Sequence, residues 1–235
     1  MRIVVTGAEH PQAARFIERM MRGNELFGIS TAPGLDLGVP VFPGAAGDLP
    51  LLLSFVPGAE VVVHFDRNFV PSDLAALSAA AAGARVRRLV VLACGARPVR
   101  VALSAGSGLA PVLLQAALPV GDGDPYGVEA ALVAWARRCA PGAGRVDLVD
   151  HQDLDGAVES ALARGQPGCC YALCGPRIGW SELHAHLGGS AAPGAPVDPR
   201  FDGDQLLDDG AARAALGWWH RDPLRTLRAL RGAAR

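Results

Sequence analysis

The chain has 235 residues and a formal net charge of -1 at pH 7, with 22 basic and 23 acidic side chains. A balance this close to neutral gives no electrostatic reason to expect nucleic acid or an anionic membrane as a partner. No apolar run reaches the roughly 20 residues that span a bilayer, and the first run ends at Thr6 and Gly7, too early for a signal peptide. We therefore expect a cytoplasmic α/β protein that acts on a small molecule.

Cysteine and lysine usage carry further information. The cysteines are Cys94, Cys139, Cys169, Cys170 and Cys174. They show neither a CxxC pair nor metal-ligand spacing, and three of them fall in the apolar run 169–174, so we expect buried thiols and no metal site. All the basic residues are arginine. This lysine-free, alanine- and glycine-rich composition is typical of a high-GC genome, and from it we expect a role in specialised metabolism.

The start of the chain predicts a strand, a glycine turn and a helix. Residues 2–6 are a β-branched run, Gly7 permits a tight turn, and Pro11 suits the first turn of a helix. This order is a dinucleotide-binding opening, in which later glycines let the backbone approach a pyrophosphate. Here His10 and Ala13 stand at two of those glycine positions. We expect His10 to obstruct the phosphates; the alternative is that its imidazole binds an anion.

The rest of the chain alternates strands and helices. Further strands are predicted at 25–29, 39–42, 60–65 and 88–94, and helices at 49–55 and 72–82, with Ser72 as N-cap and Asp73 in the first turn. The alternation predicts an α/β fold with a doubly wound, mostly parallel Rossmann-like sheet over residues 1–165. A small C-terminal lobe at 166–235 completes the same unit. Ligands bind beyond the carboxyl ends of such strands, which brings Gly7, Thr31, 65–68 and 94–97 to one cleft.

Several segments resemble one enzyme family in order and spacing. They are TGA at 6–8, AEVVVHF at 59–65, RRLVVLACG at 87–95, VLLQAALPVGDGD at 112–124, and the segments 146–162, 170–187 and 215–218. Together they resemble the extended short-chain dehydrogenase/reductases, the NAD-dependent epimerase/dehydratase group, over nearly the whole chain. The resemblance implies that Gly7, Ala8, His10 and Thr31 are the cofactor-binding positions if nucleotide binding is retained. Thr31 stands near where an NAD enzyme has an acidic residue for the ribose.

The hydride chemistry of that family has no matching residues here. It uses a tyrosine, a lysine four residues later and a serine or threonine that orients the carbonyl. The chain has no lysine, and its tyrosines, Tyr126 and Tyr171, are followed four places later by Ala130 and Gly175. Only 96–110 separates two predicted strands, so we infer that the catalytic helix is deleted or shortened. Residues 99–103 and a contact with a second copy or another protein are then expected to cover the exposed sheet face.

The candidate catalytic residues follow the predicted strands at 60–65 and 88–94. His64 and Asp66 lie beside Arg67, where Asp66 is expected to act as general base or hydrogen-bond acceptor and Arg67 to hold a carboxylate or a polarised oxygen. Cys94 is expected to face the same cleft, with Arg97 or His64 as the group that activates it. The alternatives are a structural histidine, a solvated loop and an inert cysteine.

Other polar clusters have structural explanations. Asp122, Asp124 and Tyr126 fall in a glycine-rich loop at the rim of the cleft, where two acids also suggest a cation. Asp147, Asp150, His151 and Asp153 resemble a metal cluster, but the family resemblance implies a strand over most of this stretch and then the cap of a helix over 153–164. Trp218, Trp219 and His220 are expected to pack the lobe, with ligand or partner contact as the alternative, and 188–199 is a predicted linker.

The sequence therefore predicts a non-canonical protein of this fold that binds or transforms a small organic molecule, without tyrosine- and lysine-dependent hydride transfer. If it is catalytic, we expect cofactor-independent cyclisation, dehydration or isomerisation. One alternative is a reductase that binds NAD(P) and takes its proton from substrate or water. Another is a catalytically inactive regulatory or complex-forming subunit.

Overall fold

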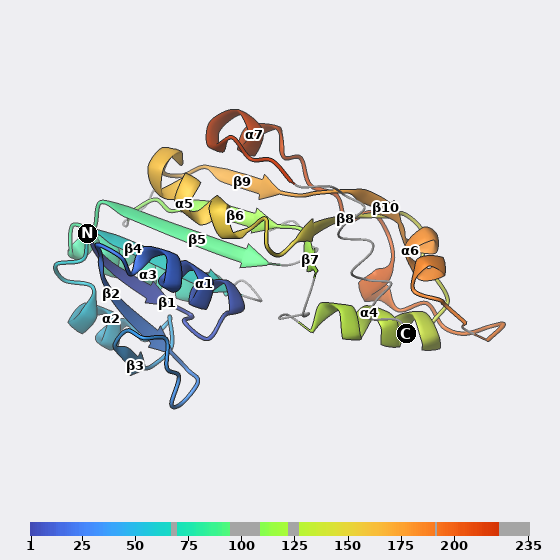
Figure 1. Ribbon diagram of the computed structural model, residues 1–235, viewed down its shortest axis with the longest axis horizontal. Coiled ribbons are helices and arrows are strands. Elements are labelled where there is room, and N and C mark those ends of the chain that lie inside the picture. The colour runs from blue at the N-terminus through green and yellow to red at the C-terminus, as the bar shows by residue number, and fades with distance from the viewer. Residues whose placement is uncertain (67–69, 95–108, 122–126, 191, 221–235) are drawn as a thin grey trace.

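A seven-stranded parallel sheet forms the centre of the protein. The computed structural model describes residues 1–66, 70–94, 109–121, 127–190 and 192–220 (Figure 1). The strands are β1 (Arg2–Thr6), β2 (Glu25–Ser30), β3 (Val41–Pro43), β4 (Val61–Asp66), β5 (Arg88–Cys94), β6 (Val112–Ala116) and β9 (Cys170–Leu173). Their order is β3-β2-β1-β4-β5-β6-β9, and every neighbouring pair is parallel. This is the doubly wound Rossmann-like sheet that the sequence predicts.

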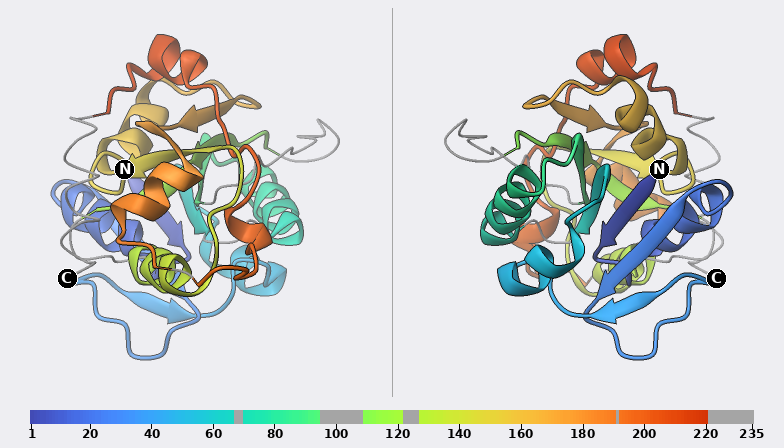
Figure 2. Two further views of the ribbon diagram at one scale, coloured as in Figure 1. Left: turned by 90° about the vertical axis from the view of Figure 1, so that its right-hand side faces the viewer. Right: turned by 90° about the vertical axis from the view of Figure 1, so that its left-hand side faces the viewer.

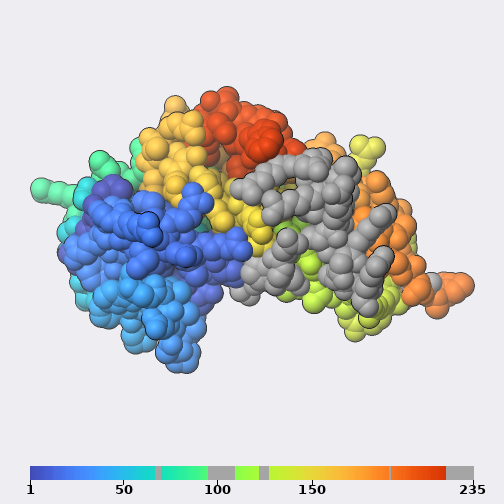
Figure 3. All heavy atoms as spheres, in the orientation of Figure 1, coloured from blue at the N-terminus to red at the C-terminus, as the bar shows by residue number. Residues whose placement is uncertain are grey.

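Helices cover both faces of this sheet. The helices α1 (Pro11–Met20), α5 (Asp155–Arg164) and α7 (Gly210–Leu216) pack on one face, and α2 (Leu49–Phe55) and α3 (Pro71–Gly83) pack on the other. Figure 2 shows α1 and α3 on opposite sides of the strands, and α1, α5 and α7 form one continuous surface in Figure 3. Successive side chains of β1 point to opposite faces of the sheet, so Ile3 and Val5 face α1 whereas Val4 faces α2. Burial on both faces explains the nearly continuous apolar strands.

A second, smaller sheet lies beside the carboxyl ends of the central strands (Figure 1). Its strands β7 (Leu118–Val120), β8 (Arg145–Asp150) and β10 (Arg177–Gly179) stand in the order β10-β8-β7. The helices α4 (Val128–Arg138) and α6 (Trp180–His186) and the short 3-10 helix η1 (Pro199–Phe201) complete a separate apolar cluster around Trp135 and Trp180. Strands β7 and β8 precede residue 165, the predicted end of the first unit, and β10 follows it. Strand β9 also follows residue 165, but it pairs with β6 in the central sheet.

Two predicted helix starts are wrong. Helix α3 begins at Pro71, and its N-cap is Val70 rather than Ser72, because proline fixes the backbone for the first helical position. Asp73 does lie in the first turn, as predicted. Helix α5 begins at Asp155, two residues after the predicted start at Asp153. The preceding turn is held by Asp150, whose side chain accepts the N–H of Gln152 at 2.8 Å.

The thiols are less uniformly buried than predicted. Cys94 and Cys174 are buried, Cys139 and Cys169 are half-buried, and Cys170 is exposed. Cys170 is the first residue of β9. In the described sheet β9 is an edge strand, with β6 as its neighbour on one side. Residues 95–108, which include 99–103 and the greater part of the stretch where the family has its catalytic helix, lie outside the described residues. Within the described part, no helix has both the length and the apolarity needed to span a membrane.

Candidate functional site

The turn after β1 depends on Gly7. Its φ is +68°, in the left-handed region, and a Cβ at this position would overlap the carbonyl oxygen of Phe65 on the neighbouring strand. The N–H of Ala8 donates to the carbonyl of Ile29 at 3.0 Å, and the Ala8 side chain is buried. The turn is thus held against both flanking strands of β1. Gly7 therefore forms the tight turn that the sequence predicts, and its contact with β4 also leaves no space for a side chain.

The helix that follows offers no free N–H group in its first three positions. Pro11 has no N–H, and the N–H of Gln12 donates to Nδ1 of His10 at 3.2 Å. The N–H of Ala13 donates to the His10 carbonyl at 2.9 Å. Anions bind at helix N-termini because those N–H groups are normally unpaired. His10 therefore acts as the N-cap of α1, a role that its position alone did not reveal.

The His10 ring is nearly fully buried rather than free in the cleft. It stacks on Phe65 with the ring centroids 5.7 Å apart, and it is 3% exposed. His10 is still among the residues that line the pocket described below. The alternative that His10 binds an anion loses its geometric basis at Nδ1, because that nitrogen already accepts the Gln12 N–H.

Glu9 joins the first turn to the end of β2. Its Oε1 accepts hydrogen bonds from the hydroxyl of Thr31 at 2.5 Å and from the N–H of Thr31 at 3.4 Å. Burial alone would raise the pKa of Glu9, but hydrogen bonds from Thr31, from its own N–H and from Ser30 together hold this pKa below its ordinary value. Glu9 is therefore ionised at neutral pH, and Thr31 already has a partner on the protein.

These groups surround a pocket of about 240 Å³ at the carboxyl ends of β1, β2 and β4, which we call the β1–β4 pocket. Its lining residues are Gly7, Glu9, His10, Thr31, Gly44, Ala45, Ala46, His64, Phe65, Asp66 and Asp73. Glu9, Asp66 and Asp73 bring three carboxyl groups, and none of these lining residues is arginine. Among the described residues, the pocket therefore presents acceptors and negative charge.

His64 connects the sheet interior to this pocket. Its Nδ1 lies 2.9 Å from Oγ1 of Thr6, and its Nε2 lies 3.7 Å from Oδ2 of Asp66. Thr6 is fully buried and His64 is 4% exposed. The Asp66 carboxylate is fixed by the N–H of Val70, which donates to Oδ2 at 2.9 Å. Thr6, His64 and Asp66 therefore form a line of polar groups that ends in the pocket.

The structure separates Cys94 from these residues. Asp66 pairs in register with Ala93, so Cys94 points to the opposite face of the sheet and joins the apolar cluster beneath α1 and α5. The prediction that Cys94 shares the cleft with His64 and Asp66 is therefore not supported by its place in the strand. Arg67, Asn68, Arg97, Asp122, Asp124 and Tyr126 lie outside the described residues.

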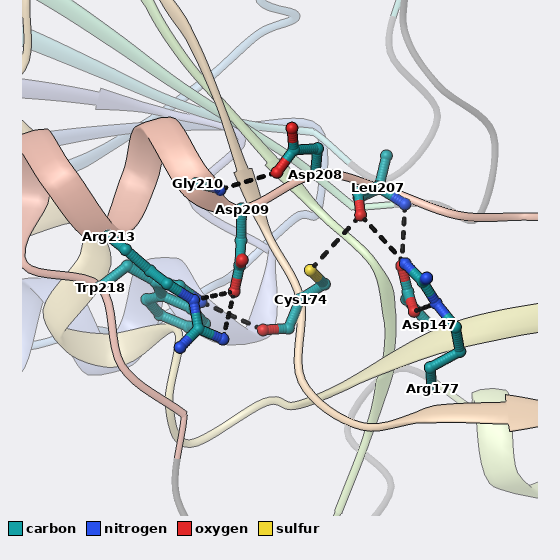
Figure 4. Close-up of polar contacts among 9 residues, drawn as sticks. All are labelled: Asp147, Cys174, Arg177, Leu207, Asp208, Asp209, Gly210, Arg213 and Trp218. Carbon is teal, nitrogen blue, oxygen red and sulfur yellow. Dashed lines mark hydrogen bonds and ion pairs between the residues drawn. The ribbon is translucent and has the colours of Figure 1, made fainter.

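The residues of the suspected metal cluster have separate structural roles. Asp147 is 2% exposed and accepts hydrogen bonds from Arg177 at 2.8 and 3.1 Å and from the N–H of Leu207 at 2.8 Å (Figure 4). His151 is buried, and its carbonyl accepts a hydrogen bond from Gln12. Within the described ranges, no group of three or more His, Cys, Asp or Glu side chains is placed to hold a metal ion.

The C-terminal segment borders a second cavity of about 460 Å³. Arg213 pairs with Asp209 at 2.7 Å beside Cys174, and Nε1 of Trp218 donates to the Cys174 carbonyl at 3.1 Å (Figure 4). Trp218 is buried as predicted for packing, whereas Trp219 is 69% exposed. These contacts hold the segment against β8 and β9.

Sequence reasoning missed two charged residues that line the β1–β4 pocket, Glu9 and Asp73, and also Thr6, which contacts His64 behind it. Glu9 and Asp73 have charged side chains in a turn and in a first helical turn, where charge is normally solvated. Thr6 is the last residue of β1, and its contact with His64 depends on the register between β1 and β4. Only Glu9 could have been identified from the sequence, because it lies between Gly7 and His10 in the turn that resembles a dinucleotide-binding loop.

The fold and the site define a doubly wound Rossmann-like α/β protein with a small second sheet. No family model matches the chain, and no curated protein matches it. Solved structures do share the fold. The Bordetella bronchiseptica enzyme WbmG in complex with NAD has a TM-score of 0.72 and 20% identity, over 99% of this chain and 93% of that chain.

Two further structures give the same result. The dTDP-glucose 4,6-dehydratase DesIV from Streptomyces venezuelae has a TM-score of 0.70 and 17% identity, over 99% of this chain and 97% of that chain. A nucleoside-diphosphate-sugar epimerase from Pseudomonas aeruginosa has a TM-score of 0.69 and 18% identity, over 98% and 96%. At these identities the likeness establishes the fold, which is the fold implied by the family resemblance of the sequence.

Proposed function

We propose that the protein binds and transforms a small organic molecule in the β1–β4 pocket by proton transfer, without tyrosine- and lysine-dependent hydride transfer. Asp66 is the proposed general base, and His64 is the group that exchanges a proton with it or with the ligand. Thr6 holds the imidazole of His64 in place. A role in specialised metabolism is part of the same proposal and rests on composition alone.

The line from Thr6 through His64 to Asp66 carries this proposal. A carboxylate can take a proton from a ligand C–H or O–H group, and a nearby imidazole can return it at a second atom. Nε2 of His64 lies 3.7 Å from Oδ2 of Asp66, and Asp66 is among the residues that line the pocket, so Asp66 stands between the buried imidazole and a ligand. In an isomerisation the proton is removed at one atom and returned at another. In a dehydration a C–H proton is removed and a proton is delivered to the hydroxyl group, which leaves as water. In a cyclisation the attacking group loses the proton and the group that it attacks gains one.

The NAD that is named with the WbmG and DesIV structures does not fit these residues. A pyrophosphate binds unpaired N–H groups at a helix N-terminus, but Pro11 has none, and the N–H groups of Gln12 and Ala13 are bonded to His10. The ionised carboxylate of Glu9 would also repel the phosphates. The proposed proton transfer therefore involves no nicotinamide.

Isothermal titration with NADH and NADPH tests the cofactor part of the proposal. We expect no binding by the natural protein in the micromolar range. Binding in that range would overturn the proposal and favour the tyrosine-independent reductase. His10→Gly frees the N–H of Gln12, but we still expect no binding by this variant, because Pro11 lacks an N–H and the carboxylate of Glu9 remains.

Hydrogen–deuterium exchange tests the proton-transfer part. A panel of sugars and small carbonyl compounds is incubated with the protein in D2O, and NMR follows deuterium entering carbon positions of each compound. We expect exchange in the panel member that the pocket accepts, and a loss of about 10²- to 10⁴-fold in Asp66→Asn, since this is the usual contribution of a general base. Unchanged exchange in Asp66→Asn would remove Asp66 from the mechanism.

A further inference from the structure

We propose that residues 207–218, which we call the strap, open as one unit while the central sheet stays folded. The strap contains α7 and lies at the edge of the central sheet, beyond β9 (Figure 1). When closed it covers Cys174 and forms one side of a cavity, and opening connects both to solvent. Three observations support this inference: the cavity beneath the strap, its attachment at two ends, and the shortness of its helix.

The first half of the strap spans a cavity. This is the cavity of about 460 Å³ at the C-terminal segment. Its lining on the strap is Leu207, Asp208, Asp209 and Arg213, and its lining on the rest of the protein is Asp147, Cys174, Gly175 and Arg177. Most of these side chains are charged. Because burial of apolar surface is the main source of packing energy, this half of the strap gains little stability from packing.

The first attachment of the strap is at Leu207. Its N–H donates to Oδ2 of Asp147 at 2.8 Å, and its carbonyl accepts a hydrogen bond from Nη2 of Arg177 at 3.4 Å (Figure 4). Sγ of Cys174 lies 3.9 Å from the same carbonyl. Asp147 is buried and belongs to β8, so its carboxylate fixes the start of the strap to the second sheet.

The second attachment is at the end of the strap. Nε1 of Trp218 donates to the carbonyl of Cys174 at 3.1 Å, and the guanidinium of Arg164 donates to the carbonyl of Leu216. The side chains of Ala212, Leu216 and Trp218 are buried in the apolar cluster that also contains residues of β9 and α5. The apolar packing of the strap is therefore concentrated in its second half.

The helix between these attachments is short. Helix α7 has seven residues, and isolated helices of fewer than about 12–15 residues are marginal in water. The ion pair between Arg213 and Asp209 joins two residues of the strap itself, so it does not attach the strap to the strands. Helix α7 is therefore stable only while it is docked. We expect the helix and both attachments to be lost together, as in a cooperative unit of local unfolding.

Amide hydrogen exchange of the full chain, followed by NMR, tests the opening. The amides of Leu207, Arg213 and Trp218 are hydrogen-bonded at the start, middle and end of the strap. We expect these three amides to have the same protection factor, at least about tenfold below that of the β4 amides. Their protection should also depend less on urea, because local opening exposes less surface than global unfolding. Equal protection in the strap and β4, or three unrelated protection factors within the strap, would overturn the inference.

Two variants act at the attachments. Asp147→Asn should lower the protection of all three amides by the same factor, at least about tenfold, although only the Leu207 amide is bonded to Asp147. Trp218→Phe removes the Nε1 donor at the other end and should lower the protection of Leu207 as well. It keeps the test decisive if Asp147→Asn does not fold. A loss of protection confined to the residue beside each substitution would mean separate local fluctuations, and the strap would not be one unit.

Ile29→Val is the matched control in the central sheet. Ile29 is fully buried in β2, in the apolar cluster beneath α2 and α3, and the substitution removes one methylene group. Opening of the strap leaves Ile29 packed. We therefore expect this variant to lower protection in β4 by about two- to tenfold and to leave the three strap amides unchanged. An equal loss in β4 and in the strap would show that the strap opens only when the whole protein unfolds, which contradicts the proposal.

Discussion

Nδ1 of His10 accepts the N–H of Gln12 at 3.2 Å, so the side chain of His10 occupies an N–H group at the N-terminus of α1. The imidazole stacks on Phe65 and completes the N-terminus of α1 from within the protein. The first turn of this chain is therefore stabilised by its own side chains and has no need of a bound anion. This relationship leads to the first prediction.

His10→Ala should destabilise the protein by about 0.5–2 kcal/mol, the usual cost of losing an N-cap. His10→Asn should restore most of this loss, because asparagine is a good N-cap residue. The free energy of unfolding in urea, measured for the natural protein and both variants, checks this. If His10→Ala and His10→Asn unfold at the same urea concentration, the cap contributes nothing.

Gly7→Ala should be far more damaging than Gly23→Ala. Both glycines have positive φ, +68° and +85°, so both substitutions have the left-handed backbone cost of roughly 1–2 kcal/mol. Only at Gly7 would the new methyl group also overlap the carbonyl of Phe65, whereas Gly23 has no atom within 4 Å of its Cβ position. The midpoint of thermal unfolding compares the two variants. A similar midpoint for both would contradict the close contact at Gly7.

The strands, their parallel arrangement and the convergence of Gly7, Thr31, His64 and Asp66 follow from the sequence. Uninterrupted apolar runs predict strands covered on both faces, and the carboxyl ends of parallel strands meet at one edge. These are local patterns and a general rule of topology, so a single chain is enough to reveal them.

Side-chain direction at the site could not be predicted in the same way. Cys94 lies on the face opposite Asp66 because Asp66 pairs with Ala93, and a single sequence does not specify that register. The capping role of His10 likewise depends on a ring orientation set by Phe65, a residue 55 positions later (65 − 10). Contacts between distant residues therefore decided the parts of the site that the sequence left open.

Asp147→Asn should cost about 1.5–3 kcal/mol, the usual contribution of hydrogen bonds to a charged group, because the buried carboxylate holds the partly exposed Arg177 and the N–H of Leu207 together (Figure 4). The exposed pair of Arg213 and Asp209 lines the same cavity, and Arg213→Gln should cost no more than about 1 kcal/mol. Urea unfolding of both variants measures the contrast. Equal losses would mean that burial of Asp147 does not set the strength of its contacts.

Cys174 should resist alkylation at neutral pH, while Cys170 reacts. Burial raises the pKa of the Cys174 thiol from 9.0 to about 12, with further contributions from Asp209 and Asp147, and its Sγ lies 3.9 Å from the Leu207 carbonyl. Burial and Cys169 also raise the pKa of Cys170, but that thiol is exposed. Mass spectrometry after iodoacetamide treatment of the folded protein identifies the modified sites. Early modification of Cys174 would contradict its burial beneath the C-terminal segment.

The same raised pKa predicts how stability depends on alkaline pH. In the unfolded chain the Cys174 thiol loses its proton near pH 9.0, whereas in the folded protein it keeps the proton until about pH 12. Ionisation therefore favours the unfolded state across this window, and stability falls as pH rises from about 9 to 12. Cys174→Ala lacks this titration, so its free energy of unfolding should fall less steeply over the same pH range. Parallel curves for Cys174→Ala and the natural protein would show that the thiol is not responsible.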